Sequence, residues 1–498
     1  MLLLKKQNLN RHLVFFLFLG FCYFSFFLRL TSYPLLMWDE SRFAVNALEM
    51  LKTHNFIVQY YNGVPDMWNT KPPLASWLMA ICFKLIGYNE LAVRMTSALA
   101  ATFVSMVIFR FVRKQTKDLF SAFLSGMVFI TSIGFIGSHV ARSGDADSLA
   151  VLFITLFVFY FYELIIGYGN NQSVSPWRFY RPAIFLSLVF MTKSSYGLIC
   201  LPGLFFLIIY FKKFRILFNR HFYFSFLVSL IPILVYSIAR ENENQGYLNA
   251  VLQNDFLNRY TSSFEEHLHP FYYYFVEIAR TRFFPWIYFF PLSLLVLLMS
   301  KNEWVKKTLI VNLVMSSSIL LFLSFSQTKT EWYDAAFYPF ASIFIGVGVK
   351  EVLVYFINAL KVKSQVVQNT LYVILFVTIF YYPVRKVIRY ANSKPPQADH
   401  YQLKYGPFMK KIYSSDFSSP IKYLEPGYNA HLLFYTEVYQ LKNQNPTIVK
   451  DWSDFKKNEL VATCTPSLKT EIEKRYEVSL FFKDEYCTCY KIIGKKFQ

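Results

Sequence analysis

Two short segments of the chain carry carboxylates, and each also contains an arginine. Trp38-Asp39-Glu40-Ser41-Arg42 is the first segment, and Arg142-Ser143-Gly144-Asp145-Ala146-Asp147 is the second. A carboxylate can take the proton of an attacking hydroxyl as a general base. Cations can bind a phosphate and stabilise the charge that develops on it as it leaves. These residue types therefore predict group transfer from a phosphate-linked donor.

Lysines and arginines elsewhere in the chain are candidates for the phosphate-binding cations. Lys71 stands before two prolines at the start of a short apolar run, where it is expected at the level of lipid headgroups. Lys193, Arg280, Arg282 and Lys329 fall at the ends of other apolar runs. Purely structural roles are also open for these residues. Asp39 could cap the N-terminus of a helix, and Lys71 could simply extend its charged end to the membrane surface.

The composition places these residues in a membrane protein. Of the 498 residues, 55% are hydrophobic, 20% are aromatic and only 16% are charged. Soluble domains carry about 25% charged residues, so a disordered chain, a coiled coil and a secreted disulfide scaffold are excluded. The net charge of +20 is better explained by basic cytoplasmic loops than by a nucleic-acid partner.

The apolar runs predict an all-α polytopic membrane protein with about 11 to 13 spans. The first run, residues 13–30, is read as an uncleaved helix with its N-terminus inside. Residues 74–86 are too short to span and are read as an interfacial or re-entrant helix. Residues 1–390 are therefore expected to form the membrane domain, with two large outer loops at residues 31–91 and 240–283.

The last hundred residues are more polar and predict a small extracytoplasmic α/β domain over residues 391–498. Alternating stretches at residues 477–482 and 486–493 are typical of strands. Cys464 is expected to pair with Cys487 or with Cys489, since these two are separated by one residue. A zinc site is disfavoured because a convincing fourth ligand is lacking.

Motifs spread over residues 13–348 resemble a known family. They are Asp39-Glu40-Ser41-Arg42-Phe43-Ala44, Lys71-Pro72-Pro73-Leu74 with Trp77, Arg94, Asp147 before an apolar helix, Met191-Thr192-Lys193, His269-Pro270-Phe271 with Tyr274, Phe284-Pro285-Trp286, and Ser324-Phe325-Ser326 with Thr328, Lys329 and Tyr333. In this order they resemble the bacterial family related to protein O-mannosyltransferases, which includes the aminoarabinose transferase that acts on lipid A.

The resemblance implies a GT-C fold and an inverting glycosyltransferase that uses a sugar on a polyprenyl phosphate. It places the enzyme in the bacterial inner membrane with the active site on the periplasmic side, the side on which the order of the apolar runs places the tail domain. The acceptor is expected to be a hydroxyl or phosphate of lipid A, a polysaccharide or a protein, and the sugar is left open between a hexose and a pentose. A transporter or lipid flippase is the alternative, but it would favour charges in mid-span and internal repeats.

The resemblance also assigns roles to individual residues. Asp39 becomes the leading catalytic carboxylate, with Glu40 beside it, and Asp147 becomes the second acid, with Asp145 as its alternative. The donor phosphate is expected to bind Lys71, supported by Lys193, Arg282 and Lys329. Arg42, Tyr333 and His269 are expected to contact substrate.

One departure from the family concerns a metal. In the lipid A branch an acidic residue precedes the Lys-Pro motif and helps to bind a metal, whereas this chain has Thr70 there. No metal site is therefore carried over and no cofactor is assigned, although a divalent metal is left open. His267 and His269 are interpreted as structural or substrate-contacting residues. The departure also weakens lipid A as the acceptor.

Overall fold

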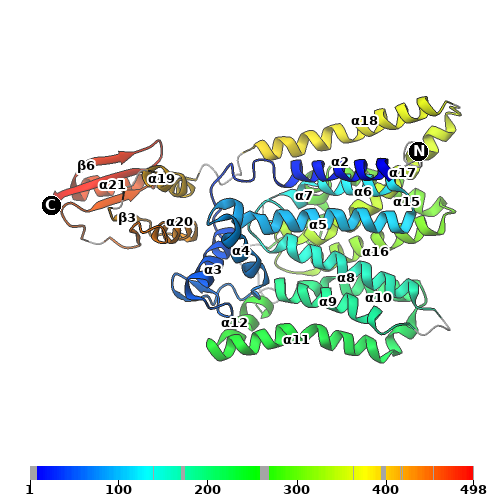
Figure 1. Ribbon diagram of the computed structural model, residues 1–498, viewed down its shortest axis with the longest axis horizontal. Coiled ribbons are helices and arrows are strands. Elements are labelled where there is room, and N and C mark those ends of the chain that lie inside the picture. The colour runs from blue at the N-terminus through cyan, green and yellow to red at the C-terminus, as the bar shows by residue number, and fades with distance from the viewer. Residues whose placement is uncertain are drawn as a thin grey trace. The chain divides into compact units, whose positions relative to one another are not determined.

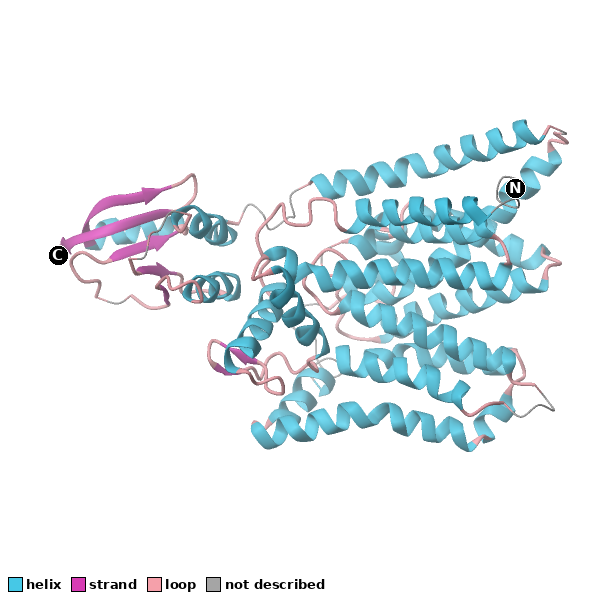
Figure 2. Ribbon diagram, viewed as in Figure 1, coloured by secondary structure: helices cyan, strands magenta, loops and turns pink. Residues whose placement is uncertain are grey.

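The computed structural model describes residues 8–137, 139–169, 174–257, 268–362, 364–393, 400–414, 417, 419–452 and 454–496. The chain forms two compact units, each built from separated segments. The helical unit comprises Met1–Arg29, Met67–Ala75 and Thr96–Ser393. The loop–tail unit comprises Leu30–Asp66, Ser76–Met95 and Lys394–Gln498. Figure 1 labels the elements along the chain, and Figure 2 shows that the larger sheet belongs to the tail.

The helical unit consists of long apolar helices and short helical turns. Its elements are α2 Asn8–Phe26, most of α5 Glu90–Thr116, α6 Leu119–Ile130, α7 Ile133–Ile136, α8 Asp147–Gly167, α9 Trp177–Lys193, η1 Ser194–Cys200, α10 Leu201–Tyr210, η2 Phe214–Phe218, α11 Arg220–Glu243, α12 Tyr247–Val251, η3 Leu252–Leu257, α14 Tyr273–Glu277, η4 Ile278–Arg282, η5 Trp286–Phe289, α15 Phe290–Met299, α16 Glu303–Phe325, η6 Glu331–Ala336, α17 Phe337–Ala359 and α18 Gln365–Asn392.

The fold class is confirmed, but the count of spans differs from the prediction. Among the described residues, seven helices are long and apolar enough to cross a membrane, or eight if a bent pair is counted as one span. Two neighbouring apolar runs of the sequence, at residues 182–191 and 197–210, lie within one span, Trp177–Tyr210. Apolar helices such as α6 fall short of the length that a bilayer requires. By this criterion of length and composition, fewer of the described helices qualify as spans than the 11 to 13 predicted.

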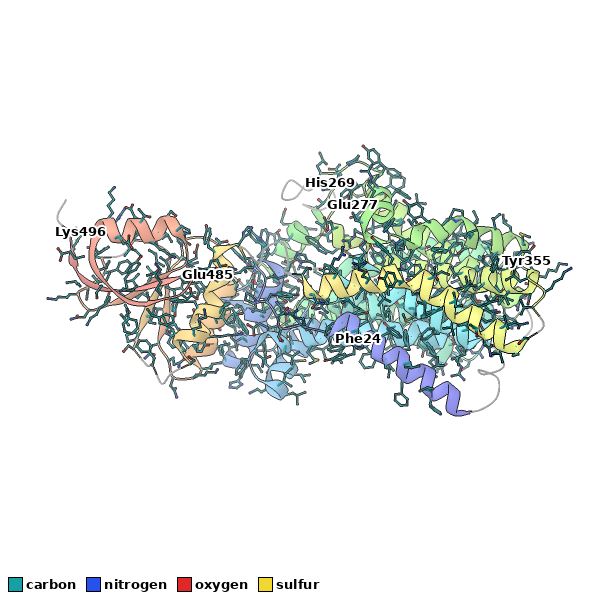
Figure 3. The ribbon with its side chains drawn as sticks, turned by 90° about the horizontal axis from the view of Figure 1, so that it is seen from above. Phe24, His269, Glu277, Tyr355, Glu485 and Lys496 are labelled. Carbon is teal, nitrogen blue, oxygen red and sulfur yellow. A yellow bond between two sulfur atoms is a disulfide. The ribbon has the colours of Figure 1, made fainter. Side chains whose placement is uncertain are left out.

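Close helix packing in this unit depends on small residues. Gly346 of α17 faces α6, and a Cβ on this glycine would lie 2.4 Å from the Cα of Ser125. Small residues at such positions allow two helix backbones to approach closely within a membrane. Aromatic side chains such as Phe24 and Tyr355 point outward instead, with 53% and 73% of their surfaces exposed (Figure 3). This distribution suits a lipid environment, in which outward apolar groups are not penalised.

The loop–tail unit combines the first outer loop with the tail. Its elements are α3 Asp39–Thr53, β1 Tyr60–Tyr61, β2 Val64–Pro65, α4 Leu74–Ile86, the start of α5, η8 Tyr401–Lys404, α19 Tyr405–Ile412, β3 Ile421–Leu424, α20 Ala430–Gln440, β4 Pro446–Val449, β5 Leu460–Thr463, α21 Pro466–Arg475, β6 Tyr476–Lys483 and β7 Thr488–Lys495. The 13-residue helix α4 has the predicted bounds. Helix α3 is buried along most of its length, so it does not lie with one side exposed to lipid or solvent.

The tail folds as the predicted α/β domain around a five-stranded sheet. The strand order is β4-β3-β5-β7-β6, in which β3 pairs in parallel with β4 and β5, and β7 pairs antiparallel with β5 and β6. Helix α20 connects β3 to β4, as a parallel pairing requires. The two strands predicted from alternation correspond to β6 and β7. Their pattern is therefore a correct indicator of strand structure.

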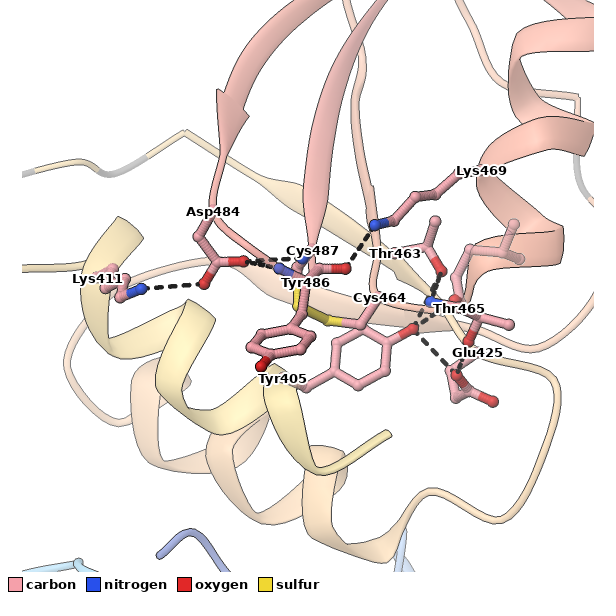
Figure 4. Close-up of a disulfide and its surroundings, with 11 residues drawn as sticks. Tyr405, Lys411, Glu425, Thr463, Cys464, Thr465, Lys469, Asp484, Tyr486 and Cys487 are labelled. Carbon is pink, nitrogen blue, oxygen red and sulfur yellow. Dashed lines mark hydrogen bonds and ion pairs between the residues drawn. A yellow bond between two sulfur atoms is a disulfide. The ribbon is translucent and has the colours of Figure 1, made fainter. Parts of the chain in front are cut away.

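A disulfide joins the segments next to two neighbouring interior strands of the sheet, β5 and β7. Cys464 follows β5 and bonds to Cys487, which precedes β7, whereas Cys489 is buried and unbonded (Figure 4). This pairing is one of the two that the sequence left open. Beside it, the Tyr405 hydroxyl donates a hydrogen bond to the buried Glu425 carboxylate (Figure 4). The Thr465 hydroxyl, in the loop after β5, donates a further hydrogen bond to Glu425, so the loops after β3 and β5 are fixed to each other and to α19.

Candidate active site

A buried ion pair joins two spans of the helical unit. Asp147 is the first residue of α8 and Lys193 is the last residue of α9, and Lys193 Nζ lies 2.5 Å from Asp147 Oδ1. The two side chains are only 7% and 9% exposed. Each charge also suits its helix end, because a carboxylate is stabilised at an N-terminus and an ammonium at a C-terminus. The sequence places these helix ends, and the fold brings the two predicted residues together.

Two tyrosines surround the Lys193 ammonium. Its Nζ lies 4.8 Å from the ring centroid of Tyr196 and 5.1 Å from that of Tyr333. The Tyr196 hydroxyl donates a hydrogen bond to the Tyr333 carbonyl, so the two loops are locked together. Aromatic faces attract a cation without neutralising it. The position of the Lys193 ammonium is thus fixed from three sides, by Asp147, Tyr196 and Tyr333.

Lys193 lines a cavity together with Lys71 and Tyr333. The cavity has a volume of about 90 Å³, and its further lining residues are Ser194, Ser195, Tyr196, Ile199, Phe322, Leu323, Ser326 and Thr328. Two lysines and a row of hydroxyl groups can bind an oxyanion. Two of the four predicted phosphate-binding cations and the predicted substrate-contacting tyrosine therefore share one cavity.

Asp145 belongs to a separate cluster before α8. Its carboxylate lies 3.2 Å from His139 Nδ1 and accepts a hydrogen bond from the Ser143 hydroxyl at 2.7 Å. The His139 ring stacks on Trp332, with the ring centroids 4.0 Å apart. Burial opposes ionisation of Asp145, but His139 and Ser143 outweigh that effect and hold the pKa of the carboxyl below its ordinary value. Asp145 is therefore an ionised, internally partnered group.

The Arg282 guanidinium is engaged by a buried carboxylate. It donates two hydrogen bonds to Asp334, at 2.8 and 2.7 Å, and a third to the carbonyl of Gly134. The Tyr338 hydroxyl donates to the same carboxylate at 2.6 Å. A bidentate pair of this kind fixes geometry. Arg282 therefore orders the η6 segment that carries Tyr333.

Lys329 and His269 meet on a loop beside the spans. Lys329 Nζ donates to the carbonyls of His269 and Ser326, and burial lowers the pKa of this lysine. The His269 ring stacks on Tyr273, with the centroids 4.1 Å apart. The Lys329 ammonium thus joins two main-chain segments. His267 lies outside the described residues.

In the loop–tail unit, Asp39 and Glu40 occupy the first turn of α3 but differ in their partners. Glu40 is 1% exposed and forms a bidentate pair with Arg94, with N–O distances of 2.7 and 3.0 Å. Arg94 also donates to the carbonyls of Leu30, Tyr33 and Pro34. Within the part of the chain that the structure describes, no hydrogen bond or ion pair engages the half-buried Asp39 carboxylate. Glu40 therefore fixes the loop that presents Asp39.

Arg42 follows on the same helix and anchors the small β1–β2 hairpin. It donates two hydrogen bonds to Asp66, at 2.8 and 2.6 Å, and its guanidinium lies 4.6 Å from the ring centroid of Tyr61. Asn46 donates to the same Asp66 carboxylate at 3.1 Å. The Arg42 side chain is still 17% exposed. Only the exposed edge of the Arg42 guanidinium can therefore contact a ligand.

Comparisons with known proteins agree with this architecture. Residues 70–248 match the family described as dolichyl-phosphate-mannose-protein mannosyltransferase. The crystal structure of ArnT from Cupriavidus metallidurans, bound to undecaprenyl phosphate, superposes with a TM-score of 0.70 at 15% identity, covering 95% of this chain and 97% of that one. The chain has the GT-C fold. The resemblance to the mannosyltransferase and aminoarabinose transferase group is thereby confirmed.

Two curated relatives are about a quarter identical to the chain over the part that aligns. An uncharacterized protein of Aquifex aeolicus is 26% identical over 62% of this chain and 58% of its own length. The undecaprenyl phosphate-alpha-4-amino-4-deoxy-L-arabinose arabinosyl transferase of Shewanella sediminis is 26% identical over 59% of this chain and 52% of its own length. The chain thus spans a little over half the length of these two relatives.

The metal arrangement implied by the family does not fit this chain at the Lys-Pro motif. Thr70 stands at the position of the acidic ligand, is 1% exposed and uses its carbonyl to accept a hydrogen bond from Tyr247. A neutral hydroxyl does not replace a carboxylate as a ligand for a divalent cation. No step proposed below involves a metal.

Several residues of these clusters were not predicted from the sequence. Tyr196, His139, Asp66 and Asp334 were not predicted, although each contacts or partners a predicted residue. His139 lies six residues before Asp145, and this proximity could have indicated it. Tyr196 lies three residues after Lys193 and could have been indicated in the same way. Asp66 and Asp334 carry no local signal, because their partners Arg42 and Arg282 are remote in the sequence.

Proposed function

We propose that the chain transfers a sugar from a polyprenyl phosphate to a hydroxyl or phosphate of a cell-envelope acceptor, with inversion of the anomeric centre. The observation that carries this proposal is the cavity lined by Lys71, Lys193 and Tyr333, with Lys193 held by Asp147. Lipid phosphate is the ligand that two lysines on a membrane-spanning bundle would bind. The undecaprenyl phosphate bound to the solved ArnT structure supports the same class of donor here.

In the proposed reaction the acceptor oxygen attacks the anomeric carbon of the donor. The bond between that carbon and the phosphate oxygen breaks, and the polyprenyl phosphate leaves with its electron pair. Asp39 takes the proton of the acceptor hydroxyl as a general base. Lys71 and Lys193 stabilise the charge on the departing phosphate. A single displacement inverts the configuration at the anomeric carbon.

The remaining predicted residues take positioning roles in this proposal. Asp147 orients Lys193 through the ion pair, and Glu40 orients the start of α3 through Arg94. Arg282 orders the segment that carries Tyr333, so we do not assign it to the donor phosphate. Asp145, which is paired with His139, remains the alternative to Asp147 as the second acidic residue of the site.

We further place the chain in the bacterial inner membrane with the reaction on the periplasmic side. Support comes from the disulfide between Cys464 and Cys487, which persists in oxidising compartments. The basic segments at residues 110–117 and 212–220 then face the cytoplasm, as the distribution of lysine and arginine favours. A cysteine-accessibility assay at introduced sites in both regions would test this orientation.

The activity can be tested with the full-length protein in lipid nanodiscs. The donors are undecaprenyl phosphate carrying mannose and undecaprenyl phosphate carrying 4-amino-4-deoxy-L-arabinose, offered with a cell-envelope lipid and polysaccharide extract. We expect release of undecaprenyl phosphate from one donor and gain of its sugar by the extract. Replacement of Lys71 or Lys193 by methionine is expected to raise the KM for the donor at least tenfold.

A matched variant controls for loss of charge alone. Lys301 is exposed at the turn before α16 and is absent from the cavity lining, so Lys301→Met should leave the donor KM unchanged. If the protein moves the intact donor across the bilayer without releasing undecaprenyl phosphate, the transferase proposal fails in favour of a flippase.

A further inference from the structure

Trp38, the residue before Asp39, forms an open aromatic platform in the loop–tail unit. Its surface is 53% exposed, and its indole stacks on the ring of Tyr428, with centroids 4.5 Å apart and planes inclined by 14°. One face of the indole therefore rests on the tail domain. The opposite face is available to a ligand beside the residue proposed as the base.

The backbone of Trp38 is held in an uncommon conformation. Its φ of 70° and ψ of −125° are rarely adopted by a residue with a Cβ atom. The Trp38 carbonyl accepts hydrogen bonds from the Tyr428 hydroxyl at 3.3 Å and from the Ser41 hydroxyl at 3.0 Å. Such strained residues persist only where the surroundings fix them, and they cluster at ligand and active sites. Loop and tail thus both hold the platform in place.

Tyr428 comes from the part of the tail sheet where ligands commonly bind. Strand β3 ends at Leu424 and pairs in parallel with β4 on one side and β5 on the other, and Tyr428 lies on the loop that follows. In open α/β sheets ligands bind outside the carboxyl ends of the parallel strands, at the point where the strand order reverses. The tail therefore offers Tyr428 at such an edge.

The polar residues near the platform favour a neutral ligand. The Asp39 carboxylate follows Trp38 directly, and the Arg42 guanidinium on the same helix is already paired with Asp66. A phosphate headgroup would meet a carboxylate and no unengaged cation among these three groups. A hydroxyl-rich ligand could instead donate to Asp39 and accept from the exposed edge of Arg42.

A pyranose ring matches both parts of this surface. Its axial C–H bonds form a weakly positive face that suits the negative face of an aromatic ring, and its hydroxyl groups suit the flanking charges. We propose that Trp38, supported by Tyr428, binds a sugar ring of the acceptor, so that the acceptor is a saccharide. This inference rests on the proposed function, because it names the acceptor class of that reaction.

Sugar binding can be measured without any transfer reaction. The full-length protein in nanodiscs made of phospholipids is titrated with methyl β-glycosides of glucose, galactose and N-acetylglucosamine, and contact is read by saturation-transfer NMR. We expect at least one glycoside to bind, Trp38→Phe to retain most of the signal, and Trp38→Leu to lose at least four-fifths of it. Trp177 in the helical unit is also 53% exposed, so Trp177→Leu is the matched control and should bind as the parent does.

Two outcomes would overturn the platform. Trp38→Leu that binds like the parent would make Trp38 a simple membrane-surface aromatic, and equal loss in Trp177→Leu would show a general effect of tryptophan removal. Tyr428→Phe and Tyr428→Leu provide a second test of the platform. Only the leucine variant should weaken sugar binding, because it loses the ring that stacks on Trp38. If sugar binding depends on Trp38 but no donor is consumed, the proposed transferase function fails while the sugar site stands.

Discussion

Lys193 Nζ lies 2.5 Å from Asp147 Oδ1, and this pair joins the end of helix α9 to the start of helix α8, 46 residues apart in sequence. Neither charge is more than 9% exposed. A buried charge that loses its partner is costly, because its desolvation is no longer repaid. The pair therefore couples the proposed phosphate site to the stability of the bundle.

Removal of one partner should be more damaging than removal of both. We expect Asp147→Asn to destabilise the protein by about 3 kcal/mol, since breaking a buried pair typically costs about 3–5 kcal/mol. The double variant Asp147→Asn/Lys193→Met should recover part of this loss while it still binds donor poorly. Thermal unfolding in nanodiscs would measure the first effect and undecaprenyl phosphate binding the second. A double variant less stable than either single variant would contradict the coupling.

Asp39 and Glu40 are adjacent, yet substitution of the first should affect catalysis and substitution of the second should affect stability. Asp39→Asn is expected to lower kcat for sugar transfer about 10²–10⁴-fold, the usual contribution of a general base, with an unchanged unfolding temperature. Glu40→Gln is expected to lower the unfolding temperature, because it leaves the fully buried Arg94 short of its carboxylate partner. Steady-state transfer assays and thermal unfolding of the same preparations would separate the two effects. Undiminished transfer by Asp39→Asn would remove the assigned role.

Local signals in the sequence predicted much of the fold. Helix α4 has its predicted bounds, Leu74–Ile86, because two prolines precede its first residue and Gly87 follows its last. The strands β6 and β7 were found from their alternation, which reports one buried and one open face. Such patterns depend only on neighbouring residues.

Contacts between remote segments were not predictable in the same way. The tail packs into one unit with the first outer loop, and Glu90 receives hydrogen bonds from Lys410 and from Tyr435 across more than 300 residues. Neither periodicity nor charge indicates which distant loop a polar tail will meet. The same limit explains why Asp334, which lies 52 residues from its partner Arg282, was missed.

A buried pair of carboxyl groups should make the loop–tail unit sensitive to pH. Burial and a hydrogen bond with Glu49 raise the pKa of Glu437 in α20 to about 8. The folded chain therefore retains a proton between pH 4.5 and 8 that the unfolded chain releases. By linkage, the stability from this group is complete below about pH 4.5 and is lost as the pH rises through 8. We expect hydrogen exchange in α20 to accelerate over this range.

Substitution of Glu437 should remove that dependence. Glu437→Gln keeps a hydrogen-bond donor toward Glu49 but cannot ionise, so its exchange rates between pH 5 and 8.5, corrected for intrinsic chemistry, should stay level. Glu485 is exposed in the β6–β7 turn, and Glu485→Gln should retain the parent's dependence. A parent protein whose α20 is equally protected at pH 5 and pH 8.5 would contradict the raised pKa.

The bond between Cys464 and Cys487 should stabilise the tail against unfolding. The residues are 23 positions apart, and closing a loop of that length in the unfolded chain contributes about 3 kcal/mol. We therefore expect Cys464→Ser/Cys487→Ser to unfold in the tail at a lower temperature, as read by protease cleavage within residues 400–496. Cys489→Ala removes a buried but unbonded cysteine of the same sheet and should cost less. If reducing agent lowers the tail's stability in the double variant as much as in the parent, the effect does not come from this bond.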